Sequence, residues 1–248
     1  MNDDKLILNE EGLPPVKRAM VIVAHPDDPE YFMGGTLAKL ARHGVEVRVL
    51  VVTDGSKGSD DRTLSAEELT RIRREEQREA VRRWGGKDAI FFDYPDGELP
   101  DTPEVMRKVV REIRRFQPDL VLTNDPQRFY YESGRINHRD HRTIGAIVLD
   151  AVFPAARNFR YFPSLIEEGF ETWYVREVWL CSPLEANHQL NTEDVVEIRV
   201  NAILAHTSQV GDGSRIRKRI ADQRARGEPF IEKFKRIELR GAPRRSGV

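Results

Sequence analysis

Three residues that could bind a metal or transfer a proton follow the first apolar run of the sequence. The run is Met20–Ala24, and His25, Asp27 and Asp28 come almost directly after it. A short apolar run bounded by turn residues is typical of a buried strand. In open α/β sheets, ligands bind at the carboxyl ends of such strands, so these side chains are predicted to lie at a binding edge.

A second cluster of the same residue types lies far along the chain, at Asn137–His141. His138 and His141 are one helical turn apart, so both can face the same point if a helix begins here. With His25 and Asp28, one of these histidines would complete a set of two histidines and one carboxylate. That set suits zinc or ferrous iron and leaves a position open for water.

Each residue of the first cluster also has an ordinary structural role open to it. Asp27 could cap a turn, Asp28 could cap the following helix, and His25 could be a buried histidine with a hydrogen-bond partner. The second cluster argues against this interpretation. The spacing alone permits the two aspartates to exchange roles, and it favours one metal ligand and one base over two ligands.

The two clusters together resemble the signature of one enzyme family. The pattern AHPDD-x-E-x-x-x-GGT with a distant H-x-D-H is similar to the LmbE-like, GlcNAc-PI de-N-acetylase (PIG-L) family of metal-dependent N-deacetylases. Many members have a glutamate directly after the two aspartates, whereas this chain has Pro29 there and Glu30 one position later. Weaker matches are Arg73-x-x-Glu76, Tyr94–Gly97, Pro118-Asp119 and Ala205–Gln209.

The resemblance implies a metal site and a base. His25, Asp28 and His141 would bind the metal. Asp27 would take a proton from the attacking water and pass it to the leaving amine. A bound metal lowers the pKa of its water towards ~7 and polarises the carbonyl, which amide hydrolysis at neutral pH requires.

The resemblance also implies an oxyanion stabiliser and three substrate contacts. His138 would offer a positively charged N–H to the oxyanion, and Asp140 would fix its tautomer and keep it charged. Arg73 would contact the substrate, although the residues alone do not separate it from neighbouring arginines. Asp96 would face the sugar, and Glu30 is a further candidate substrate contact.

The implied protein is a zinc-dependent hydrolase that removes an acetyl group from the amide nitrogen of an N-acetylglucosamine-containing small molecule. Fe²⁺ or another divalent metal remains open. The alternatives are a hydrolase of another amide or of a phosphoester, and a non-catalytic sugar-binding relative. Two-metal phosphatases usually need more carboxylates and histidines than these clusters hold, and the dinucleotide-binding pattern G-x-G-x-x-G is absent.

The elements that must position these residues alternate as in an α/β fold. Arg18–Ala24 and Val45–Thr53 are predicted strands joined by a helix at Thr36–His43, a unit that makes the strands parallel. Further strands are expected at 88–92, 120–124 and 177–182, and further helices at 65–84, 103–116 and from 138 onward. We expect an α/β fold, a Rossmann-like, mostly parallel sheet with helices on both faces in three layers.

The last part of the chain is expected to form a helical extension of a single domain, 1–248. Val195–Val200 is predicted to be a strand or extended segment that leads into a helix at about residue 201. His206 is expected to pack or to support another residue, and Arg215–Arg226 to form a basic helix. Residues 1–17 are expected to be a lead-in, and about 241–248 a disordered tail.

Composition limits the partners. Forty basic and 41 acidic residues give a net charge of −1, which argues against affinity for nucleic acid or an anionic membrane. No run approaches the roughly 18 apolar residues of a membrane helix, the N-terminus is unlike a signal peptide, and a lone Cys181 excludes an internal disulfide framework. We expect a cytoplasmic protein with an N-acetylated sugar as its partner; a homo-oligomer remains open. Phe129–Tyr131 could stack on a sugar or pack in the core.

Overall fold

The computed structural model describes residue 9 and residues 11–241. These residues form one sheet of seven strands in the order β3-β2-β1-β4-β5-β7-β6. Strands β1 to β5 pair in parallel, and β7 is antiparallel to both of its neighbours. The strands are β1 (Arg18–Val23), β2 (Glu46–Thr53), β3 (Asp88–Tyr94), β4 (Leu120–Asn124), β5 (Glu177–Cys181), β6 (His188–Asn191) and β7 (Ile231–Glu238).

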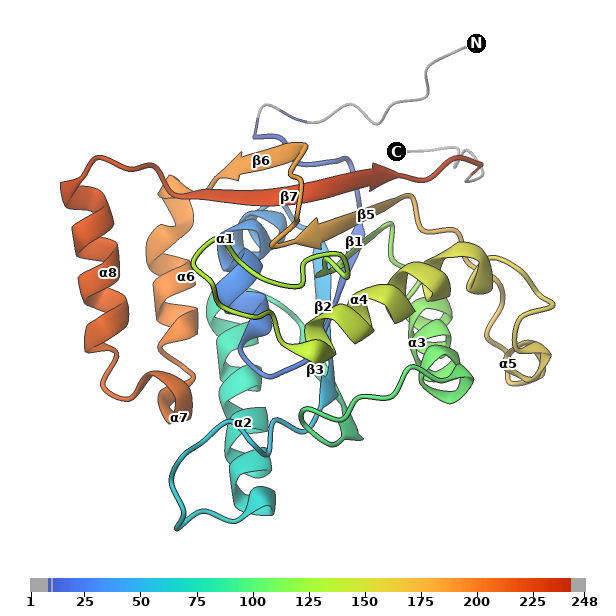
Figure 1. Cartoon of the computed structure of the whole chain (residues 1–248). Coiled ribbons are helices and arrows are strands. Elements are labelled where there is room, and N and C mark those ends of the chain that lie inside the picture. The colour runs from blue at the N-terminus through green and yellow to red at the C-terminus, as the bar shows by residue number, and fades with distance from the viewer. Residues whose placement is uncertain (1–8, 10, 242–248) are drawn as a thin grey trace.

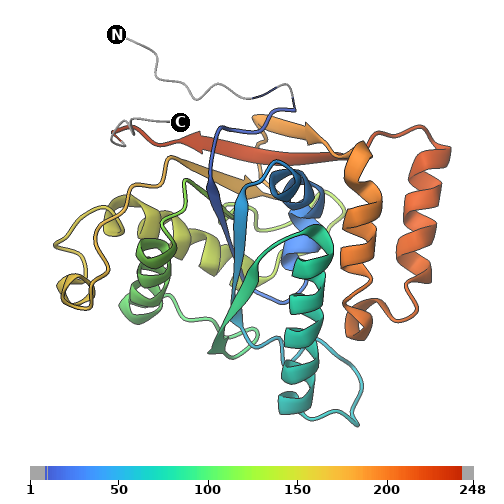
Figure 2. The same cartoon turned by 180° about the vertical axis from the view of Figure 1, so that it is seen from behind.

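Helices cover both faces of this sheet, so the predicted three-layer α/β/α architecture is confirmed (Figures 1 and 2). Val21 and Val23 of β1 pack on the side of α1 and α2, whereas Met20 and Ile22 pack on the side of α3 and α4. The helices are α1 (Asp28–Arg42), α2 (Ala66–Trp84), α3 (Pro103–Phe116), α4 (Arg139–Asp150), α5 (Pro163–Glu167), α6 (Val196–Ile203), α7 (Thr207–Val210) and α8 (Ser214–Ala225).

The strand order places a topological switch point beside β1. The chain proceeds from β1 outward to β2 and β3, and then returns to place β4 on the other side of β1. Ligands of open α/β sheets bind outside the carboxyl ends of the strands at such a point. The first cluster follows β1, and the second lies at the start of α4, which follows β4.

Helix α1 begins earlier than the sequence predicts. The expected start was Thr36, but the helix starts at Asp28 and is kinked at Met33, whose φ is −150° and ψ 18°. Beyond the kink, the Glu232 carboxylate of β7 accepts hydrogen bonds from the backbone N–H groups of Gly35 and Thr36, at 2.8 and 2.7 Å. Glu232 therefore caps the second half of α1 from a strand that is distant in sequence.

The predicted strand at Val195–Val200 is wrong, because this segment forms the start of α6. Val196 and Val200 lie one turn apart and pack with Phe230, so helical burial overrides the β propensity of valine. The expected helical extension also misses β6 and β7, which extend the sheet. Helix α8, close to its predicted position, lies outside α6 (Figures 1 and 2). The predicted tail lies beyond the described residues, apart from Gly241.

Candidate active site

The two clusters meet at the carboxyl edge of the sheet. The loop after β1 brings His25 and Asp28 to this edge, and the start of α4 brings His141 there, 116 residues further along the chain from His25. The N-terminal ends of α1 and α4 come close together at this point (Figure 1). The strand order therefore produces the convergence that the sequence only suggested.

The three predicted metal ligands direct one polar atom each at a common point. His25 Nδ1 lies 3.2 Å from His141 Nε2, His141 Nε2 lies 3.1 Å from Asp28 Oδ1, and His25 Nδ1 lies 3.7 Å from Asp28 Oδ2. Neighbouring donors of a tetrahedral zinc ion with bonds near 2.0–2.1 Å are separated by about 3.3 Å. The donor atoms and their spacing therefore fit a divalent metal.

The outer nitrogens of both histidines face oxygen atoms. His25 Nε2 faces Asp96 Oδ1 at 3.1 Å and Asp140 Oδ2 at 3.4 Å, and His141 Nδ1 lies 3.0 Å from Asn137 Oδ1. Such partners keep the proton on the outer nitrogen and leave the inner nitrogen free to bind a metal. Asn137 has no predicted role, although its position one helical turn before His141 is a usable signal.

The charges around the centre favour a cation. Burial alone would lower the pKa of His25, but hydrogen bonds to Asp140, Asp28 and Asp96 raise it well above 6.5. Burial would raise the pKa of Asp28, but His141 and His25 hold it well below 3.8. Asp28 therefore carries the negative charge that favours a divalent cation at this point.

Asp27 points away from its neighbour Asp28 and remains free of the ligand set. Its φ of 104° and ψ of −27° lie in the left-handed region, and its side chain caps no helix N–H. A non-glycine residue held there stores strain, which is characteristic of functional sites. Burial raises the pKa of Asp27 to about 6, although Arg73 acts to lower it. This carboxyl can therefore accept and release a proton near neutral pH.

Arg73 is the arginine of α2 that reaches the site. Its guanidinium donates to the carbonyls of Pro26 and Gly55, at 2.6 and 2.8 Å, and lies 3.5 Å from Asp27 Oδ2. Asp96 lies on the other side, 4.0 Å from the same guanidinium. Arg73 is buried, and its guanidinium donates to the loop after β1 and to the loop after β2. A substrate contact by Arg73 or Asp96 remains a prediction.

Asp140 lies nearer to other partners than to His138, with which it is predicted to pair. The Asp140 carboxylate accepts the backbone N–H groups of Gly97 and Leu99, at 2.7 and 3.2 Å, and faces His25. Its distance to His138 Nδ1 is 3.9 Å. That nitrogen instead accepts the backbone N–H of Asp140 at 3.2 Å, which leaves the proton of the neutral ring on Nε2.

The positive charge expected on His138 stays a prediction, and the surroundings of this side chain act against it. Burial, with the neighbouring His25, lowers the pKa of His138 below its usual value. The ring stacks edge-to-face on His25, with 4.5 Å between the centroids. A neutral His138 can still donate a hydrogen bond through Nε2. It could therefore stabilise an oxyanion as a neutral donor, without the positive charge that was expected.

Glu30 does not line the site, which corrects its expected role as a substrate contact. Its side chain is fully buried between α1, α2 and α7. The carboxylate accepts from Gln77 Nε2 at 3.1 Å and from Trp84 Nε1 at 2.8 Å, and lies 3.1 Å from His206 Nε2. Glu30 therefore supports neighbouring elements, and His206 packs as expected.

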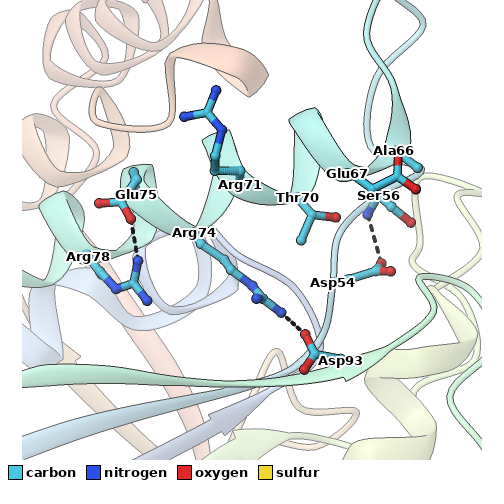
Figure 3. A pocket seen from close by; sticks show the side chains of 10 residues that line it. All are labelled: Asp54, Ser56, Ala66, Glu67, Thr70, Arg71, Arg74, Glu75, Arg78 and Asp93. Carbon is cyan, nitrogen blue, oxygen red and sulfur yellow. Dashed lines mark hydrogen bonds and ion pairs between the residues drawn. The ribbon is translucent and has the colours of Figure 1, made fainter.

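A cavity of about 470 Å³ lies on the outer face of α2 and contains none of the metal ligands. Figure 3 shows Arg74 reaching across it to Asp93. Asp54 connects this cavity to the site, because its carboxylate accepts the backbone N–H of Asp96 at 3.0 Å.

Near the other rim of the site, Phe129 and Tyr130 are 58% and 71% exposed, so they do not pack in the core.

The fold and the site together define an α/β/α protein of the metal-dependent hydrolase class. The chain belongs to the PIG-L family, described as GlcNAc-PI de-N-acetylase, whose family model matches residues 20–152. It is 35% identical to the diacetylchitobiose deacetylase of Thermococcus kodakarensis, over 78% of this chain and 70% of that protein. It is 28% identical to the mycothiol S-conjugate amidase of Streptomyces coelicolor, over 78% of this chain and 82% of that protein.

Solved structures agree with this assignment. The N,N'-diacetylchitobiose deacetylase of Pyrococcus horikoshii matches with a TM-score of 0.79 and 31% identity, over 90% of this chain and 85% of that one. The hydratase GalB of Pseudomonas putida matches with a TM-score of 0.70 at 19% identity, over 93% of this chain and 100% of that one, a likeness of fold alone. Among residues 11–241, no helix is both long and apolar enough to cross a bilayer.

Proposed function

We propose that this protein is a metal-dependent N-deacetylase that hydrolyses the acetamide of an N-acetylglucosamine-containing small molecule. One observation carries the proposal. His25 Nδ1, Asp28 and His141 Nε2 converge within 3.7 Å of one another, while the adjacent Asp27 stays outside this set. Three ligands and a separate base are the parts that metal-assisted amide hydrolysis needs.

Asp27 would move the proton in this reaction. Its carboxylate takes a proton from the water that attacks the acetyl carbon and later delivers it to the leaving nitrogen as the C–N bond breaks. The products are acetate and a free amine. A pKa of about 6 suits both steps near neutral pH. When bound, the divalent metal would supply Lewis-acid polarisation of the carbonyl and a lower pKa for water.

His138 would stabilise the negative charge that develops on the acetyl oxygen. Its Nδ1 accepts the backbone N–H of Asp140, so Nε2 carries the hydrogen and can donate it. Asp140 and Asp96 would act on the opposite side of His25, where they orient the ring that binds the metal. Arg73 would hold the loop that carries Asp27.

Zinc is the proposed metal, because two histidines, one carboxylate and an open position form a common catalytic zinc set. The same donors also accept ferrous iron, so the assay below includes both ions. A cytoplasmic location is a further proposal, supported by a single buried cysteine, Cys181, in a chain that needs no disulfide. Cell fractionation tests the location, and sedimentation tests for a homo-oligomer.

The test is acetate release after removal of metal and its restoration. The protein is stripped with a chelator and assayed with zinc or ferrous iron on diacetylchitobiose, N-acetylglucosamine and N-acetylglucosaminyl conjugates of malate and inositol. Diacetylchitobiose comes first, because two relatives above 30% identity are deacetylases of that name. We expect release that disappears with chelation and returns with metal.

A matched variant separates deacetylation by this centre from a contaminant. Asp28→Asn removes one ligand with little change in volume, and should lose both the metal and the activity. Normal metal content without release from any N-acetylated sugar would contradict the proposal. Hydrolysis of p-nitrophenyl phosphate under the same conditions would favour the phosphoesterase alternative.

A further inference from the structure

Gln77 connects the interior of the protein to the backbone of Asp27. This side chain of α2 is fully buried. Its Oε1 accepts the backbone N–H of Asp27 at 2.8 Å, and its Nε2 donates to the two oxygens of Glu30 at 3.1 and 3.2 Å. Both ends of the amide are therefore used, and neither bond involves a metal ligand.

The buried Glu30 fixes which end of the amide faces Asp27. Trp84 Nε1 donates to Glu30 at 2.8 Å, and His206 Nε2 lies 3.1 Å from the same carboxylate. The backbone N–H of Asp27 can only donate, so Gln77 must turn its amide oxygen towards Asp27 and its NH₂ group towards the oxygens of Glu30. Its oxygen is then left for Asp27, and a flipped amide would place two acceptors together.

Arg73 and Gln77 hold opposite sides of a single peptide unit. They are four residues apart, one turn of α2, and therefore lie on the same face of the helix. Arg73 donates to the carbonyl of Pro26 at 2.6 Å, and Gln77 accepts the N–H of Asp27. The Pro26–Asp27 peptide plane is thus fixed at both its oxygen and its hydrogen.

This peptide plane matters because Asp27 has an unfavourable backbone conformation. A φ of 104° is sterically unfavourable for a residue that carries a Cβ, such as aspartate. Relaxation would rotate the carboxylate away from the metal centre, whereas Asp28 is independently held by the backbone N–H of His25 at 2.9 Å. The position of Asp27 therefore depends on the hydrogen bonds that Arg73 and Gln77 make to the Pro26–Asp27 peptide, whereas the position of Asp28 does not.

We propose that Gln77 is a positioning residue, which holds Asp27 in its strained conformation and so aims the base at the metal centre. Glu30, which accepts from Gln77 Nε2, fixes the orientation of the Gln77 amide. This inference rests on the proposed function, because only that function makes Asp27 a catalytic base. We therefore expect that loss of the hydrogen bond between Gln77 and Asp27 slows the chemical step without loss of metal or of substrate binding.

The experiment compares Gln77→Met with Trp84→Phe, both in the zinc-loaded full chain. Methionine has a similar length but cannot accept the Asp27 N–H. Phenylalanine removes one hydrogen bond to Glu30 and leaves the contact with Asp27 intact, so it is a matched control for damage to the network. The measurements are kcat and KM for the best substrate, zinc per chain and the unfolding temperature.

We expect Gln77→Met to lower kcat roughly 10- to 100-fold, as for a displaced catalytic group, while KM and zinc content stay within about twofold. Trp84→Phe should lower the unfolding temperature but change kcat by less than about twofold. Gln77→Glu provides a rescue and a second test if the methionine variant does not fold. Protonated Glu can both accept from Asp27 and donate to Glu30, so its kcat relative to wild type should fall as the pH rises.

Three results would overturn the inference. They are an unchanged kcat in folded Gln77→Met, equal losses of kcat in Gln77→Met and Trp84→Phe, and a Gln77→Glu variant without the pH-dependent rescue. Wild-type protein that binds zinc but releases no acetate would contradict the proposed function instead. The two failures are thus distinguishable, because one appears in the variants and the other in the wild type.

Discussion

Two adjacent aspartates are turned to different tasks by their backbone angles. Asp28 is the first residue of α1 and faces His141, whereas Asp27 precedes the helix with a φ of 104° and faces Arg73. Two neighbouring side chains in a helix would point about 100° apart. The left-handed conformation of Asp27 turns its side chain to a different direction from that of Asp28, so that the two carboxylates reach different partners. The spacing of the sequence left this choice open.

Asp27→Asn should keep the metal and lose turnover. Asparagine tolerates the left-handed region and has nearly the same shape, but it cannot take a proton. We expect kcat to fall roughly 10²- to 10⁴-fold with unchanged zinc content, as measured by acetate release and metal analysis. Asp28→Asn is the matched control and should lose zinc. Substantial activity in a zinc-loaded Asp27→Asn protein would exclude Asp27 as the base.

The pairing of His206 with Glu30 should make stability depend on pH. Burial acts to lower the pKa of His206, but Glu30 outweighs it and raises the pKa above 6.5. The folded protein therefore binds this proton more tightly than the unfolded chain. The stabilisation is complete below about pH 6.5 and is lost as the pH rises through the folded pKa.

His206→Gln tests this dependence through urea unfolding between pH 6 and 9. The difference in unfolding free energy between wild type and variant should shrink as the pH rises. A constant difference for His206→Gln would mean that this histidine is neutral in the folded protein.

Helix α4 carries His141 close to the sheet because it contains Gly145. A Cβ at this position would overlap the Asn124 carbonyl oxygen and lie 3.1 Å from Pro126. Both neighbours belong to the end of β4 and the loop behind it, and neither is a flexible side chain. The missing side chain therefore lets the helix approach the strand.

Gly145→Ala should push α4 outward and weaken the metal site. His141 lies one turn before Gly145, so we expect weaker zinc binding along with a loss of about 1–3 kcal/mol in unfolding free energy. Zinc titration and urea unfolding measure the two effects. Asp150→Ala, at an exposed position of α4, should change the unfolding free energy by less than about 0.5 kcal/mol. Unchanged zinc affinity in Gly145→Ala would show that α4 is not held by this contact.

Over the whole molecule, the candidate metal site joins segments that are otherwise separate in the chain. Its ligands come from the two sides of the switch point, the loop after β1 and the helix after β4. The last segments of the chain hold α1, which begins at this edge, because Glu232 of β7 caps the kinked helix and His206 contacts Glu30. A metal that binds only the folded chain should therefore stabilise the whole fold.

Removal of metal should lower the stability of the wild-type protein. At a free zinc concentration 100 times the dissociation constant, we expect a gain of about 2.7 kcal/mol in unfolding free energy over the chelated protein. Urea unfolding with and without zinc measures it, and Asp28→Asn should show little or none of this gain. An equal zinc effect in that variant would place the stabilising ion elsewhere.

The sequence by itself determined the features that depend on neighbouring residues. Apolar runs and helix caps fixed β1, β2, α2, α3 and β4 to within a few residues, because hydrophobic periodicity and capping are local. The motif at His25–Asp28 and the motif at His138–His141 identified the family and gathered the candidate ligands. Both motifs are short, so no tertiary contact was needed to recognise them.

Only the tertiary structure decided how these residues are oriented and supported. Gln77 and Asp27 are 50 residues apart, and His206 and Glu30 are 176 apart, so no local pattern links them. The same reason applies to Asp140, which faces His25 from across the sheet edge, and to β7, whose charged sequence conceals a strand between β5 and β6. Hydrogen bonds between distant segments depend on the strand order, and the strand order follows from packing of the whole chain.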